Sequence, residues 1–156
     1  MKKIDLGQAI ALFANIAVIA GIVFLAFELR QNTIATQLIA AGSSAGYIRD
    51  MNALIVENGE LAEMLVKRSA DGELTAAERL RLVTFLSSTL IGWHAIYEQH
   101  QEGLLSDEQW RVYREGMRQV LLGYPYVQQF WARQRDSYSV GFNRLIEQLA
   151  HEPTEQ

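Results

Sequence analysis

The residues with the clearest capacity for chemistry are two histidines and a glutamate in the second half of the chain. His94 and Glu98 are four residues apart, so on a helix they share one face, and His100 follows closely. A histidine and a carboxylate at this spacing can share a transition metal, but structural zinc normally needs four ligands. The chain also has no Cys, which removes thiolate ligands and Cys nucleophiles. We therefore predict no metal site, and we expect His94 to be hydrogen-bonded at the surface of a helical bundle beside Trp93 and Tyr97.

Sequence motifs for catalysis or cofactor binding are missing elsewhere too. The chain contains no Gly-x-Ser-x-Gly, no Gly-x-Gly-x-x-Gly and no Walker loop. The glycines from Gly42 to Gly46 resemble a phosphate-binding pattern, but no strand precedes them. A net charge of −4 argues against a nucleic-acid-binding face, which needs clustered Lys and Arg. The sequence predicts a protein that is not an enzyme, holds no cofactor and binds no nucleic acid.

An apolar run near the N-terminus predicts where the protein resides. Ala9 to Phe27 is a stretch of about 19 residues without a charge, interrupted only by Asn15. As a helix it is about 30 Å long, which matches the hydrocarbon thickness of a bilayer. A cleaved signal peptide and a buried core helix are the alternatives, but the run is long for either. We predict a single-pass protein of the cell membrane, with the lipid bilayer as a partner.

Basic residues on both flanks of this run leave its orientation open. Lys2 and Lys3 favour a cytoplasmic N-terminus, whereas Arg30 and Arg49 favour the reverse. The side of the membrane that carries the C-terminal domain is therefore not predicted.

Small residues recur through the apolar run at heptad spacing. The repeat consists of Gly7, Ala11, Ala14, Val18 and Gly21, and its register continues through Leu25, Glu28, Asn32, Ala35, Ile39, Gly42 and Gly46. Lipid supplies no hydrophobic drive for association, so membrane helices commonly pack through small residues, and the Asn15 amide beside the repeat can add a hydrogen bond. We predict that this seam forms a homo-oligomer or holds another membrane protein. The alternative is a small oligomeric pore, with Asn15, Glu28 and Asn32 along its lining and Arg30 at the membrane mouth.

The rest of the chain carries helical patterns only. Residues 31–56 extend the membrane helix as one rod, and the small residues at 40–46 would permit another helix to approach closely. Asn58-Gly59 and Asp71-Gly72 are stop and turn signals, and Thr75 and Ser106 each open a capping box. These signals predict helices over 60–69, 75–102, 106–122, 125–135 and 138–150.

Two sets of apolar residues are expected to form the core of these helices. On the helix that Thr75 opens they are Leu80, Val83, Leu86, Leu90, Trp93 and Tyr97. The aromatic members expected in the core across the domain are Trp93, Trp110, Phe130, Trp131 and Phe142.

The predicted fold class is all-α: one transmembrane helix that continues as a rod, followed by a small antiparallel helical bundle. Residues 1–30 form the anchor, residues 31–150 form the bundle domain, and residues 151–156 form a frayed tail.

Three stretches resemble a family of uncharacterised bacterial membrane-anchored proteins. They are Glu28 to Thr33 (ELRQNT), Leu74 to Arg79 (LTAAER), and the segment from Tyr97 through Gln99 to Leu105 (QHQEGLL), Glu108 and Trp110, followed by Phe130-Trp131 and Phe142. The resemblance implies the bacterial inner membrane and a C-terminal helical domain, and it implies no activity. The sequence therefore predicts a non-enzymatic, membrane-anchored homo-oligomer or accessory subunit.

Overall fold

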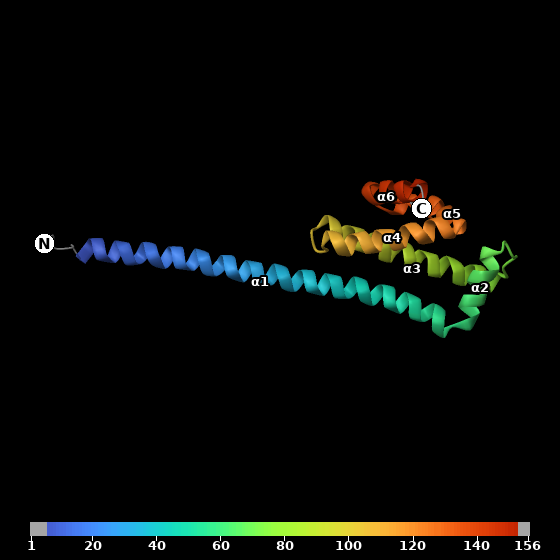
Figure 1. Cartoon of the computed structure of the whole chain (residues 1–156), viewed down its shortest axis with the longest axis horizontal. Helices are drawn as coiled ribbons and strands as arrows, with labels where there is room; N and C mark the ends of the chain where they lie inside the picture. The colour runs from blue at the N-terminus through green and yellow to red at the C-terminus, as the bar shows by residue number, and fades with distance from the viewer. Residues whose placement is uncertain (1–5, 153–156) are drawn as a thin grey trace. The chain divides into compact units, whose positions relative to one another are not determined.

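The computed structural model describes residues 6–152, without the side chains of residues 6, 8 and 9. Its α-helices are α1 (Leu6–Glu57), α2 (Gly59–Ser69), α3 (Ala76–Gln101), α4 (Asp107–Gly123), α5 (Pro125–Gln134) and α6 (Val140–His151), and a 3₁₀ turn, η1, spans Arg135–Ser137 (Figure 1). No described residue lies in a strand. The predicted all-α fold, with a long N-terminal helix followed by a helical domain, is confirmed.

The chain forms two compact units, Met1–Ile39 and Ala40–Gln156, and α1 contributes to both. α1 is an unbroken helix of 52 residues because no proline occurs within it and the first strong stop signal is Asn58-Gly59. The sequence also predicts a boundary after Arg30, where the membrane anchor would end. This boundary is defined by the membrane, so it stays a prediction. Lys2 and Lys3, and the tail from residue 153, lie outside the described residues.

In the first unit the apolar side chains of α1 face outwards on every side. Phe13, Ile19 and Leu25 are each more than 60% exposed, and they lie about a third of a turn apart around the helix. Among the described residues, one helix is long and apolar enough to cross a membrane, Ile10–Glu57, and none of its most apolar window is buried in the protein. The described residues therefore do not bury this window as the core helix that the sequence left as an alternative.

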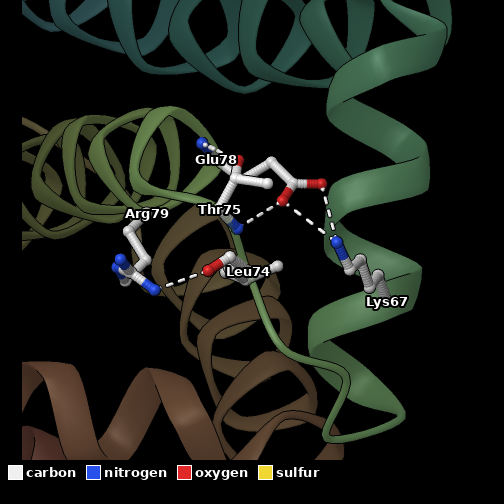
Figure 2. A network of polar contacts seen from close by, with 5 residues as sticks. All are labelled: Lys67, Leu74, Thr75, Glu78 and Arg79. Atoms are coloured by element: carbon white, nitrogen blue, oxygen red, sulfur yellow. Dashed lines mark hydrogen bonds and ion pairs between the residues drawn. The ribbon is translucent and has the colours of Figure 1, made fainter.

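The α2–α3 connection is held by a reciprocal network of hydrogen bonds (Figure 2). The Thr75 hydroxyl accepts from the backbone N–H of Glu78, and the Thr75 N–H donates to the Glu78 carboxylate at 2.6 Å. Lys67 of α2 donates to both carboxylate oxygens, at 3.0 and 3.1 Å. These bonds, led by that from the Thr75 backbone, hold the pKa of Glu78 at about 2, below its ordinary value. The predicted capping box is confirmed, and it also connects α3 to α2.

Other helix ends follow the expected signals. Asn58 ends α1 and caps α2 by accepting from the Leu61 N–H at 3.0 Å. Ser106 and Gln109 form the second capping box, at the start of α4. Gly103 ends α3 with a φ of +71°, a left-handed conformation that only glycine adopts without strain.

A single apolar core lies in the second unit and draws on α2 to α6. Its buried members are Leu61, Met64, Leu82, Leu86, Leu90, Trp93, Ile96, Leu105, Met117, Leu121, Val127, Trp131, Phe142, Leu145, Ile146 and Leu149. Of the aromatic residues expected there, Trp93, Trp131 and Phe142 are buried, whereas Trp110 and Phe130 are partly buried against the core.

The predicted core stripe of α3 was wrong in its first two turns. Leu80 is 69% exposed and Val83 is 45% exposed, whereas Leu82 is buried. Leu82 lies one helical turn before Leu86, so the two share the face that the other helices cover. Leu80 is two residues from Leu82 and therefore projects to the opposite side of α3, where no other helix covers it.

Replacing the caps tests these helix boundaries. Thr75→Ala and Ser106→Ala each remove an acceptor for an otherwise unpaired N–H, so each should lower the free energy of unfolding of the helical domain by about 1 kcal/mol. Thr84→Ala is the matched control, because Thr84 is exposed within α3 and caps nothing. Thermal or denaturant unfolding monitored by circular dichroism measures the effect. Equal midpoints for all three variants would contradict the boundaries.

Candidate functional site

Two of the three chemistry-bearing residues that the sequence singled out, His94 and Glu98, form a hydrogen-bonded cluster with Ser139 at the start of α6. His94 Nε2 lies 3.1 Å from the Ser139 hydroxyl and 3.1 Å from Glu98 Oε1, and the Ser139 hydroxyl donates to the same carboxylate at 3.1 Å. Ser139 also caps α6 by accepting from the Phe142 N–H. The expectation of a hydrogen-bonded His94 is confirmed. The cluster attaches α6 to α3.

The cluster does not have the geometry of an activated serine. In a catalytic triad the carboxylate and the hydroxyl use different imidazole nitrogens, so that the base is oriented while it takes a proton. Here Ser139 and Glu98 both contact Nε2 of His94. His100 lies apart from them, stacked on Trp110 with ring centroids 4.5 Å apart. Across residues 6–152, no group of three His, Asp or Glu residues is placed to hold a metal ion.

The membrane-helix residues lie on α1 as their spacing predicts. Gly7, Ala11, Ala14, Val18 and Gly21 are exposed along one stripe, and Asn15 is exposed beside it. A Cβ built on Gly21 meets nothing within 4 Å. The described part of the chain therefore leaves this stripe uncovered.

The polar residues that follow the apolar run do not share one face. Glu28 and Asn32 are four residues apart, so they stand on the same side of α1, whereas Arg30 is two residues from each and projects to the other side. All three are exposed. The Thr33 and Thr36 hydroxyls donate back to carbonyls one turn earlier, which satisfies them within the helix.

In the second unit, α1 is attached to α3 by side-chain hydrogen bonds and by one close contact. Buried Ser44 donates to the Gln99 side chain at 2.6 Å, and the Tyr47 hydroxyl donates to the Ser88 carbonyl at 2.9 Å. A Cβ on Gly92 would collide with the Tyr47 ring. Burial raises the pKa of Tyr47 to about 12, so its hydroxyl keeps its proton and continues to donate. Because position numbers rise along α1 as they fall along α3, the two segments run antiparallel.

A half-open groove of about 1290 Å³ lies in the helical domain, and it is the candidate functional site. Its walls come from the C-terminal part of α1, from α2, α3 and α4, and from the start of α5. Representative lining residues are Tyr47, Met51, Leu65, Phe85, Trp93, Val112, Gly116, Val120 and Tyr126. Small-molecule sites commonly have volumes of about 300–1,000 Å³, so this apolar groove has room for a larger ligand.

The groove carries no charge at neutral pH. Among the described residues that line it, none is Asp, Glu, Lys, Arg or His. Burial raises the pKa values of Tyr113 and Tyr126 above their ordinary value, so both phenols stay protonated. The groove is therefore suited to a hydrocarbon ligand.

A smaller cavity of about 320 Å³ lies next to the groove and has the opposite character. Leu86 and Tyr126 line both cavities. The charged residues that line the smaller one are three arginines from three elements, Arg68 of α2, Arg79 of α3 and Arg133 of α5. Arg68 stands over the Tyr126 ring, 5.6 Å from its centroid. We call this cavity the arginine pocket.

Sequence analysis missed the residues that shape these sites. Gly92 and Gly141 each lie where a Cβ would collide with a tyrosine, Tyr47 and Tyr97 respectively. Ser139 precedes α6, and a serine followed by an apolar helical pattern is the signal that could have identified it as a cap. The groove and the arginine pocket leave no local signal, because each is made by several helices.

Comparison with known proteins finds no matching family model, no matching curated protein and no matching solved structure. The resemblance to membrane-anchored bacterial proteins therefore stays a prediction.

Two glycines test the packing, because alanine at one should lower the free energy of unfolding and alanine at the other should raise it. Gly92→Ala forces a methyl group into the Tyr47 ring and should destabilise the domain by about 1–3 kcal/mol. Gly116→Ala places the same methyl group in open space within α4 and should stabilise the domain by up to about 1 kcal/mol through helix propensity. Chemical unfolding of the two variants measures both effects. A Gly92→Ala protein as stable as the parent would show that Tyr47 does not pack on Gly92.

Proposed function

We propose that this protein is a single-pass protein of the bacterial inner membrane that associates through α1 and carries a non-enzymatic binding domain. The observation that supports membrane insertion is the uniform exposure of apolar side chains on residues 10–29 of α1. A helix that is apolar on all sides is buried in a large core or spans a membrane. The described chain provides no core around it, and such an exposed surface far exceeds the apolar patches that soluble monomers tolerate.

The binding role is supported by the groove, which is large, apolar and open to solvent. The polar cluster around His94 acts in capping and attachment, so it gives the domain no evident reaction to catalyse. Self-association is supported by the uncovered stripe of small residues, because backbones pack closely in membranes where side chains are small.

Membrane insertion is tested by extraction. The full-length protein should stay in the membrane pellet after washing with carbonate or high salt, because those treatments remove only peripherally bound proteins. Replacing both Ile16 and Ile19 with Asp should release a fraction of it, since a carboxylate costs about 2.5–3.5 kcal/mol at the centre of a span. Ile16→Leu with Ile19→Leu is the control and should behave like the parent. Recovery of the intact parent in the soluble fraction would refute the proposal.

Helix association is tested by matched leucine substitutions. Ala14→Leu and Gly21→Leu add bulk on the stripe, where close backbone approach is expected, and should dissociate the oligomer. Ile19→Leu and Val23→Leu lie off the stripe and should have little effect, because one lipid-facing apolar side chain replaces another. Cross-linking or single-molecule photobleaching in a bilayer counts the subunits.

If the two sets of variants give the same subunit count as the parent, the stripe faces lipid only. If the stripe variants dissociate, Asn15→Val then measures the contribution of the amide, which we expect at about 1 kcal/mol or less.

A further inference from the structure

We propose that the helical domain binds one anionic phospholipid, with its acyl chains in the groove and its phosphate between Arg68, Arg79 and Arg133 of the arginine pocket. The inference rests on the proposed membrane insertion, because the bilayer is the source of the lipid. It goes further by assigning a ligand class and a headgroup site.

The two cavities together have the chemistry of an amphiphile. The groove offers about 1290 Å³ without a charged side chain, and the arginine pocket offers about 320 Å³ with cations alone among its charged lining residues. Leu86 and Tyr126 line both, so the two cavities are adjacent. The proposal places the tail of the ligand in one cavity and its headgroup in the other. A purely apolar partner, such as a second copy of the groove, would leave the arginines without a role.

The state of the arginines supports an anionic ligand. Arg81, Arg114, Arg118 and Arg135 of the same domain are ion-paired with carboxylates. Within residues 6–152, no ion pair joins Arg79 or Arg133 to a carboxylate, and both are exposed at the arginine pocket. Arg79 donates to the Leu74 carbonyl, a neutral acceptor (Figure 2).

The chemistry of guanidinium favours a phosphate as the anion. Arg68 is oriented by its stacking over the Tyr126 ring, and its pair with Asp71 spans 3.3 Å to a carboxylate that is 94% exposed. Guanidinium groups suit phosphate because they present several N–H donors in a planar fork.

The positions of the tryptophans allow a direct test. The protein has three, Trp93, Trp110 and Trp131, and none lies in α1. Trp93 lines the groove. Phosphatidylglycerol with brominated acyl chains, added to the full-length protein in neutral detergent, should therefore quench tryptophan fluorescence at low concentration. Phosphatidylcholine with the same chains should quench only at concentrations at least about tenfold higher, because it lacks a net negative charge.

Variants assign each half of the site. The Cβ of Gly116→Phe would meet nothing within 4 Å, so its ring should enter the groove and abolish saturable quenching by phosphatidylglycerol. Gly123→Phe is a second filling variant, and its Cβ likewise meets nothing within 4 Å. Gly116→Ala is the size control. Replacing both Arg79 and Arg133 with Gln should weaken phosphatidylglycerol binding about tenfold and remove the preference over phosphatidylcholine, whereas Arg144→Gln, outside the pocket, should not.

Defined results would overturn the inference. Quenching that persists in both filling variants would show that the acyl chains lie elsewhere. Equal affinity of the parent for the two lipids would show that the arginine pocket does not bind the headgroup. Tighter binding of a brominated free fatty acid would show that the ligand is a fatty acid and not a phospholipid. If the protein is an oligomer in detergent and Gly116→Phe dissociates it, the groove is an interface between copies of the chain and not a lipid site. Retention of the protein in the carbonate-washed pellet is measured separately. A protein that stays in that pellet but binds no lipid would refute the lipid-binding inference and leave the proposed membrane insertion standing.

Discussion

The attachment of α1 to the helical domain depends on the close contact between the Tyr47 ring and the backbone of Gly92. Any side chain at position 92 would occupy the space of the ring, so glycine sets the separation of α1 and α3. The Tyr47 hydroxyl then donates a hydrogen bond to the Ser88 carbonyl, and the Ser44 hydroxyl donates one to the Gln99 side chain. Because Tyr47 also lines the groove, this contact fixes the distance between two of the groove's walls. The groove is thus a consequence of how α1 is attached.

The sequence predicted what is encoded locally and missed what several helices build. Thr75 and Ser106 were identified as caps because a cap bonds within three residues of itself, and the apolar length of α1 is likewise a local property. Leu80 was assigned to the core although Leu82 is buried, because periodicity alone does not say which side of α3 is covered. The role of Gly92 depends on a residue 45 positions away, and no pattern in a single sequence reports such a contact.

α1 is one continuous helix in two environments. The row of positions that contacts other helices in the domain differs from the row proposed for association in the membrane. Within the helical domain, its buried or half-buried positions include Ala40, Ser44, Tyr47 and Met51, which recur every three or four residues. The small-residue stripe of the apolar run, continued at heptad spacing, arrives instead at Gly42, which is exposed, and at Gly46, which is half-buried. The packed positions have the same alternating spacing but come one or two residues after those of the stripe. The two rows of positions are therefore not the same, and one substitution need not affect both.

The arginines of the domain differ in what they contact. Arg114 pairs with Glu152 and Arg135 with Glu147, which connects segments distant in sequence, whereas Arg118 pairs with Glu115 on its own helix. Exposed pairs of this kind contribute little each, typically below about 1 kcal/mol, so the fold needs none of them individually. Arg79 and Arg133 connect nothing in this way, yet both line a cavity beside an uncharged groove. Exposed cations cost little in water, and their attraction for an anion strengthens as a ligand displaces that water. Arg79 also donates to the Leu74 carbonyl, so its position serves the α2–α3 connection as well as the proposed binding of an anion.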